Sequence, residues 1–282
     1  MSERAFSFEF FPARTDEGRA RLRATATELA RLAPAFVSVT FGAGGSVQDG
    51  TLETARELQA LGLDVAPHLS CVGSSRPALR EILLRYKAQG IGRLVALRGD
   101  LPSGWGEIGE LRHASDLVRF VREQTGDWFH IEVAAYPEVH PQARSPRDDL
   151  AHFAAKVRAG ADGAITQYFF NADAYFRFVD AARAHGVDVP IVPGIMPITN
   201  HAQLARFSDA CGAEIPRWLR LNLAAFGDDL ASLRAYGLDV VGALCERLLA
   251  GGAPGLHFYT LNNVAATAAL WRRLGLERAP QR

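Results

Sequence analysis

The sequence predicts a single α/β domain, a (β/α)8 TIM barrel that extends over residues 1–282. Eight short apolar or β-branched segments alternate with longer segments of helical periodicity, which is typical of βα units. Gly62, Gly90, Gly126, Gly160 and Gly186 each end a helical segment just before a strand, as capping glycines do. Polar residues follow several of the apolar strands, at the end where such a barrel places its active site.

The elements follow one another in the order that a closed barrel requires. Strands are expected at residues 5–10, 36–40, 65–70, 93–98, 131–136, 164–169, 191–195 and 256–261. Helices are expected at residues 16–32, 51–61, 77–89, 114–124, 146–159, 172–185 and 264–274, with two or three more between 200 and 249. An open doubly wound sheet is less favoured, because the first βα turn lacks the glycine-rich dinucleotide fingerprint.

The composition disfavours several classes of function. A chain of 282 residues with 48% hydrophobic content can bury a core of barrel size. Its 31 basic and 31 acidic residues balance, so bulk charge does not favour a nucleic-acid partner. No segment approaches the roughly 18 apolar residues of a membrane span. Cys71, Cys211 and Cys245 show no close pairing, which favours a reducing compartment. From these three observations we expect a cytoplasmic protein with no membrane or nucleic-acid partner.

Glu9 is the first candidate for chemistry. It lies between Phe8 and Phe10, and the strand period of two sends it into the barrel if these phenylalanines pack against helices. Burial makes a carboxylate costly to ionise, so we expect a raised pKa and a general acid near neutral pH. A structural salt bridge with an arginine such as Arg98 is the equally weighted alternative.

Arg98 and Asp100 follow the fourth strand, and their spacing allows two interpretations. They can neutralise one another, or Arg98 can meet a phosphate or flavin while Asp100 adjusts the charge at a reacting centre. His68, His140 and His257 also lie at or near strand ends. Because no His-Glu-x-x-His motif occurs, hydrogen bonding to a cofactor or to the backbone is favoured over a catalytic metal.

Two further candidates have ordinary explanations as well. Asp149 and Lys156 are seven residues apart and therefore share one helix face, which is most often a solvated face. Phe207 lies on the helix that begins near Thr199 and Asn200, where an aromatic residue is most often part of the core.

Seven motifs occur in order along the chain: SFEFFP (7–12), VSVTFGA (37–43), APHL (66–69), ALRGDLP (96–102), AAYPEVHP (134–141), ITQYFF (165–170) and HFYTLN (257–262). Together they strongly resemble the methylenetetrahydrofolate reductase family of the bacterial, single-domain type. The resemblance runs from the first strand to the last. It implies a flavin-containing barrel in which FAD passes electrons from NADH or NADPH to 5,10-methylenetetrahydrofolate.

The resemblance also implies roles for individual residues. Glu9 would be the general acid that opens the five-membered ring of the folate to an iminium ion. Asp100 would lie beside flavin and pterin and stabilise that cation. Folate contacts would be Asp100, Gln167, Gln203 and Phe207. Cofactor contacts would be Thr40 for the nicotinamide and, for FAD, Phe41, Ala43, His68, Arg98, Gly99, Asp100, Ala114, Tyr136, His140, Ala143, Asp149 and Lys156.

The chain departs from the family pattern at a few positions. Asn263 stands where an arginine that can meet the folate is common, and Gly50 interrupts a charged motif. His152 and Ala155 replace an asparagine and an arginine beside the flavin. Oxidation of methyltetrahydrofolate, a different electron donor and a non-catalytic flavin- or folate-binding paralogue remain alternatives. The resemblance further implies a homo-oligomer.

Overall fold

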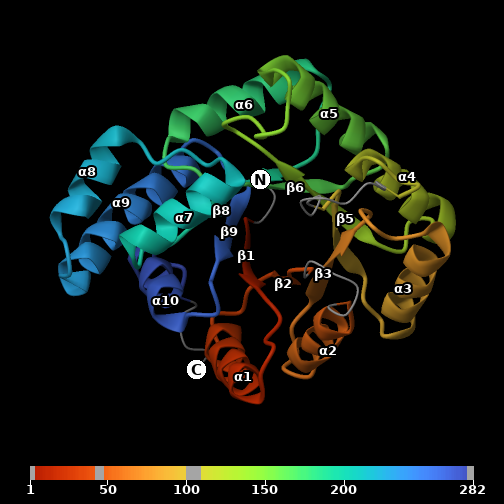
Figure 1. Ribbon diagram of the computed structural model, residues 1–282, viewed down its shortest axis with the longest axis horizontal. Coiled ribbons are helices and arrows are strands. Elements are labelled where there is room, and N and C mark those ends of the chain that lie inside the picture. The colour runs from red at the N-terminus through yellow and green to blue at the C-terminus, as the bar shows by residue number, and fades with distance from the viewer. Residues whose placement is uncertain (1–3, 42–47, 100–108, 278–282) are drawn as a thin grey trace.

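The computed structural model describes residues 4–41, 48–99 and 109–277. Its strands are β1 (Ala5–Phe10), β2 (Phe36–Val39), β3 (Val65–Ser70), β4 (Arg93–Leu97), β5 (His130–Ala135), β6 (Gly163–Thr166), β7 (Ile191–Val192), β8 (Gly194–Ile195) and β9 (Gly255–Tyr259). Its helices are α1 (Asp16–Ala30), α2 (Gln48–Gln59), α3 (Arg76–Ala88), α4 (Ala114–Thr125), α5 (Pro146–Arg158), α6 (Ala172–Ala184), α7 (His201–Cys211), α8 (Arg217–Ala225), α9 (Leu230–Ala250) and α10 (Val264–Arg273). The strands form the centre and the helices surround them (Figure 1).

The strands form a parallel barrel, as the sequence predicts. They follow the order β7-β6-β5-β4-β3-β2-β1-β9-β8, so the two ends of this series are the neighbouring segments β7 and β8. The expected strand over 191–195 is therefore interrupted at Pro193, which lacks the N–H that a ladder needs. The carbonyl of Pro193 still accepts a hydrogen bond from the His257 backbone at 3.0 Å. Residues 191–195 thus join β6 on one side to β9 on the other.

Gly194 is required at this junction by close packing. A Cβ atom there would collide with the carbonyl oxygen of Thr166 and lie 2.7 Å from the ring of Tyr259. The Thr166 hydroxyl instead accepts a hydrogen bond from the Gly194 backbone at 2.9 Å. The closing strand can therefore approach β6 and β9 only without a side chain at this position.

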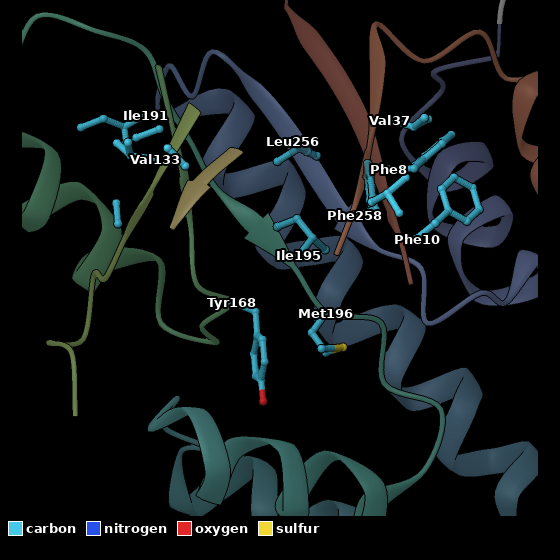
Figure 2. Packing of buried hydrophobic residues seen from close by; sticks show 14 of the residues in the cluster. Phe8, Phe10, Val37, Val133, Tyr168, Ile191, Ile195, Met196, Leu256 and Phe258 are labelled. Atoms are coloured by element: carbon cyan, nitrogen blue, oxygen red, sulfur yellow. The ribbon is translucent and has the colours of Figure 1, made fainter. Parts of the chain in front are cut away.

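The outward faces of the strands pack against the helices. Phe8 and Phe10 are almost fully buried, and Phe8 lies 5.2 Å from Trp271 of α10, measured between ring centroids. Figure 2 shows Phe8, Phe10 and Phe258 gathered on this side of β1 and β9. Because side chains alternate along a strand, Ser7 and Glu9 are left to point into the barrel.

Most helices begin at a capping side chain, and five helices end just before the glycines that the sequence predicts. Side chains of the residue before the helix accept a hydrogen bond from its first turn at Thr15, Ser75, Ser145, Asn171, Asn200, Asp229 and Asn263. The five glycines expected to end helices all have positive φ, which confirms that expectation. In the part of the chain that the structure describes, no helix is long and apolar enough to cross a bilayer.

Candidate active site

Two cavities adjoin one another at the carboxyl end of the barrel. The smaller one has a volume of about 370 Å³ and reaches down to Glu9 and His68. The larger one, of about 710 Å³, lies between the ends of β4 and β5 and the beginnings of α4 and α5. Leu97, Ala134 and Tyr136 border both cavities, so ligands in the two would meet across this shared wall.

A polar cluster closes the inner end of the smaller cavity, and we call its members Ser7, Glu9, Ser38, His68 and His257 the Glu9 cluster. The Glu9 Oε2 atom lies 3.3 Å from His68 Nε2 and 3.6 Å from His257 Nε2. The Ser38 hydroxyl donates to the same oxygen at 3.3 Å. Strands β2, β3 and β9 thus each direct one inward side chain to the carboxylate that β1 carries.

His257 is the most enclosed member of this cluster. Its side chain is fully buried, and its Nδ1 atom lies 2.7 Å from the Ser7 hydroxyl. Its Nε2 atom lies 3.4 Å from the Ser38 hydroxyl and faces Glu9. The Ser7 contact fixes the orientation of the imidazole, so that one ring nitrogen remains directed at the carboxylate.

The expectation of a raised pKa for Glu9 is wrong. Burial alone would raise the pKa, but hydrogen bonding and charge from His257 and His68 together outweigh it and lower the pKa to about 2. The alternative partner is not used either, because Arg98 directs its guanidinium group to Gln142 and to the Gly99 carbonyl. Glu9 is therefore a largely buried anion that lies between two imidazoles.

The larger cavity brings together most of the residues that the resemblance assigns to the flavin: Arg98, Gly99, Ala114, Tyr136, His140, Ala143, Asp149 and Lys156. Lys156 donates to the carbonyl of Ala134. Burial lowers the pKa of Lys156 to about 8, against the opposing charge of Asp149. The Asp149 carboxylate accepts from the backbone of His140 at 2.9 Å and so fixes the loop after β5.

The shape and charge of this cavity suit a flavin dinucleotide. Ala114 and Ser115, the first two residues of α4, line it, and a helix N-terminus directs free N–H groups at an anion. Arg98, Arg144 and Lys156 add cationic side chains around the same space. A diphosphate would be held by these groups, while the apolar wall shared with the smaller cavity would meet the ring system.

The remaining predicted contacts divide into three groups. Gln167 and Phe207 line the smaller cavity, and His68, which was assigned to the flavin, lies there beside Glu9. Thr40, Phe41 and Gln203 belong to the lining of neither cavity as far as the described residues define it. Ala43 and Asp100 lie outside the described residues.

The departures from the family pattern have separate structural roles. Asn263 caps α10, with its side-chain oxygen accepting from the Ala265 backbone at 2.9 Å. His152 lines the larger cavity and stacks on His113, with ring centroids 5.5 Å apart. Gly50 lies in α2, where a Cβ atom would make only an ordinary contact with Pro12 at 3.7 Å. Ala155 is not among the described residues that line the larger cavity.

Ser38 was not singled out from the sequence, and His257 was considered only as a metal ligand or a hydrogen-bonding residue, not as a partner of Glu9. Both occupy inward positions: Ser38 pairs with Glu9, and His257 pairs with Ser7, which points inward like Glu9. The strand alternation around Phe8 and Phe258 was the signal that would have found them. Among the described residues, no group of three or more His, Cys, Asp or Glu side chains could hold a metal ion.

Comparison with known proteins agrees with this arrangement. The family model described as methylenetetrahydrofolate reductase matches residues 1–275. The chain belongs to the methylenetetrahydrofolate reductase family. It is 41% identical to the 5,10-methylenetetrahydrofolate reductases of Salmonella typhimurium and Escherichia coli, over 96% of this chain and 90% of each relative.

Other members of the methylenetetrahydrofolate reductase family and solved structures extend the likeness. A relative from Arabidopsis thaliana named methylenetetrahydrofolate reductase (NADH) 1 is 37% identical over 98% of this chain, which spans 49% of the plant protein. A protein from Clostridium thermocellum, described as binding two copies of 5-methyl-5,6,7,8-tetrahydrofolic acid, shares the fold. Its TM-score is 0.66 at 15% identity, with 98% of this chain and 96% of that chain covered.

Proposed function

We propose that this protein reduces 5,10-methylenetetrahydrofolate to 5-methyltetrahydrofolate, with FAD in the larger cavity and NADH or NADPH as electron donor. The observation that carries the proposal is the Glu9 carboxylate, which lies between two imidazoles in the smaller cavity. This cavity shares a wall with the cavity of about 710 Å³ that Arg98, Arg144 and Lys156 line. Family membership supports the reaction. The folate named for the Clostridium thermocellum protein of the same fold supports the substrate class.

The smaller cavity would hold the pterin. Gln167 offers an amide for the polar edge of the pterin ring, and Phe207 offers an aromatic face for stacking. FAD, when bound, supplies hydride transfer in two separate halves, from the nicotinamide and then to the folate. The shared wall of Leu97, Ala134 and Tyr136 would place the reacting rings against one another.

Glu9 would deliver the proton that opens the five-membered ring of the folate. Since its own pKa is about 2, Glu9 would act as a relay that takes a proton from a donor in the Glu9 cluster and passes it to the substrate nitrogen. The resulting iminium cation would be stabilised by the negative charge left on Glu9. On the resemblance, Asp100 would add a second negative charge near the pterin and modulate the flavin potential.

The plant relatives named as NADH enzymes favour NADH over NADPH as donor. Two enzyme reactions compete with this proposal: the oxidation of methyltetrahydrofolate, and reduction of the folate by an electron donor other than NADH or NADPH. A non-catalytic binding paralogue is disfavoured by the presence of both Glu9 and Asp100. We place residues 1–282 in one catalytic domain that works in the cytoplasm, and its product would feed methionine synthesis.

Anaerobic stopped-flow spectroscopy tests the proposal on the flavin-loaded chain. We expect NADH to bleach the flavin absorbance and methylenetetrahydrofolate to restore it. Glu9→Gln should lose the second half-reaction by a factor of at least about 100, a typical contribution of a general acid, and keep the first. Bleaching that methylenetetrahydrofolate does not reverse would reject the reductase. Bleaching by dithionite but not by NADH or NADPH would point to another donor.

We also propose self-association through the exposed side of α8. Trp218 and Leu221, which are 50% and 58% exposed, form an apolar stripe there, and α8 lies at the edge of the molecule (Figure 1). Arg217 and Arg220 lie near the beginning of α8, while Asp228 and Asp229 follow its end. In an antiparallel pair of α8 helices, the arginines of one copy would face the aspartates of the other.

A further inference from the structure

Helix α7 forms one wall of the smaller cavity. Phe207, Ala210 and Cys211 line the cavity, and their spacing of three and four residues places them on one face of the helix. Any movement of α7 therefore changes the width of the smaller cavity.

The end of α7 is held by the loop that follows β5. The Glu138 carboxylate in this loop accepts a hydrogen bond from the Glu214 backbone, just beyond α7, at 2.8 Å. Gly212, which ends α7 with a φ of 76°, lies so close to Pro141 that a Cβ atom would collide with the proline ring. The loop and the helix end are thus packed without room for even one methyl group.

The same loop also borders the larger cavity. Tyr136 and His140 line that cavity, and their rings contact at a centroid distance of 4.5 Å. Between them, Val139 has a φ of 76°, a conformation that a β-branched residue adopts only when its surroundings impose it. The loop is therefore shaped by its contacts on both sides, and Glu138 is one of those contacts.

Tyr168 holds α7 at a second place. Its hydroxyl lies 3.0 Å from the Ser208 hydroxyl and 3.5 Å from the Cys211 sulfur. Figure 2 shows the Tyr168 ring pointing away from the strands, with its hydroxyl toward the neighbouring helix. Tyr168 thus holds the last turns of the helix from inside, and Glu138 holds the segment that leaves it.

We propose that Glu138 is a positioning residue, which sets the place of α7 and thereby the fit of the smaller cavity to its substrate. Burying part of the Glu138 carboxyl group against the end of α7 costs free energy, which supports this role. Its second oxygen, Oε1, is buried without a hydrogen-bond partner among the described residues. Burial, and less strongly the charge of Glu214, raise the pKa of Glu138, while the Glu214 N–H opposes the rise.

Cys211 offers a direct readout of α7 that needs neither folate nor flavin. It is the one partly exposed cysteine, whereas Cys71 and Cys245 are buried and burial raises their pKa values to about 11 and about 12. We expect iodoacetamide to alkylate Cys211 about fivefold faster in Glu138→Ala. Losing one hydrogen bond raises by that factor the population of molecules in which the end of α7 has moved away from the loop and exposes Cys211. Glu138→Gln keeps an acceptor and should react like the parent chain.

The second measurement concerns the folate and rests on the proposed function. Calorimetric titration with 5-methyltetrahydrofolate should show about fivefold weaker binding in Glu138→Ala, with binding restored in Glu138→Gln. If the parent chain binds no folate, the proposed function fails, whereas the alkylation result still decides the role of Glu138.

Either of two results would overturn the proposal. One is a Cys211 alkylation rate in Glu138→Ala that equals the parent rate. The other is equal acceleration in Glu138→Ala and Glu138→Gln, which would remove the hydrogen bond from the explanation. If Glu138→Ala does not accumulate, Gly212→Ala perturbs a neighbouring contact between the same loop and the end of α7, because its Cβ would push against Pro141. It should accelerate alkylation likewise, and an unchanged rate would again contradict the proposal.

Discussion

At the residue scale, the ionisation of Glu9 depends on side chains that are distant from it in the sequence. Its carboxylate is stabilised as an anion by His68 and His257, which come from strands β3 and β9. Strand alternation was enough to predict that Glu9 points inward. The direction of its pKa shift was not predictable, because that required knowing which side chains the other strands direct to the same point.

This carboxylate should also stabilise the fold, in a way that depends on pH. The pKa of Glu9 in the folded chain, about 2, lies below its ordinary value of 4.5. Its stabilising contribution is therefore present above pH 4.5 and is lost as the pH falls toward 2. We expect Glu9→Gln to lower the free energy of unfolding by less at pH 3 than at pH 7 in urea titrations.

The exposed Glu123 of α4 provides the control for this measurement. Glu123→Gln should change the free energy of unfolding by no more than about 0.5 kcal/mol at either pH, as is usual for surface positions. A loss in Glu9→Gln that is equal at both pH values would show that Glu9 contributes through packing and not through its charge.

Lys156 gives a second prediction, for the larger cavity. With a pKa of about 8, it is mostly protonated at pH 7 and mostly neutral at pH 9. If its ammonium group meets the flavin diphosphate, affinity for FAD should fall up to about tenfold between these pH values. Fluorescence titration of the flavin-free chain measures this, and Lys156→Met should abolish most of the pH dependence. A parent affinity that is constant over this range would place the diphosphate elsewhere.

At the scale of elements, the sequence signals were reliable for helices and for most strands. Capping residues and terminal glycines are local, so they mark the ends of α1, α3 and α10 without reference to the rest of the fold. The interruption at Pro193 was missed because the apolar run over 191–195 resembles an ordinary buried strand. The positive φ of Val139 was also invisible, since it is imposed by contacts with other elements.

Asn263 caps α10 and also stands where the family commonly has an arginine that can meet the folate. Its side chain caps α10, so both Asn263→Ala and Asn263→Arg should lower the free energy of unfolding by about 1 kcal/mol. Asn263→Arg alone should lower the Michaelis constant for the folate, more strongly at low salt, because exposed charge pairs are screened. Steady-state kinetics at two salt concentrations, with Asn263→Ala as the matched control, separates the two effects. Equal constants for both variants would leave Asn263 with the capping role only.

At the scale of the whole molecule, the barrel was predictable because its strand count and its polar strand ends follow from the sequence alone. The surface that we propose for assembly was not, since it depends on which side of α8 the core leaves uncovered. Sedimentation velocity tests our assignment of that surface. We expect Leu221→Glu to convert an oligomer to smaller species, because it buries a charge in the apolar stripe. The control Leu84→Glu, on the exposed side of α3, should leave the oligomer intact.

The junction at Gly194 restricts how this sequence can evolve. A side chain there would have to displace both Thr166 and Tyr259, so no single substitution preserves the closure of the barrel. Gly92 has open space around it and no positive φ, and alanine should be accepted there. In a saturation library selected for folded protein, we expect position 194 to keep only glycine while position 92 diversifies. The lineage that carries this barrel thus inherits, at position 194, a residue that it cannot exchange while it keeps this closure.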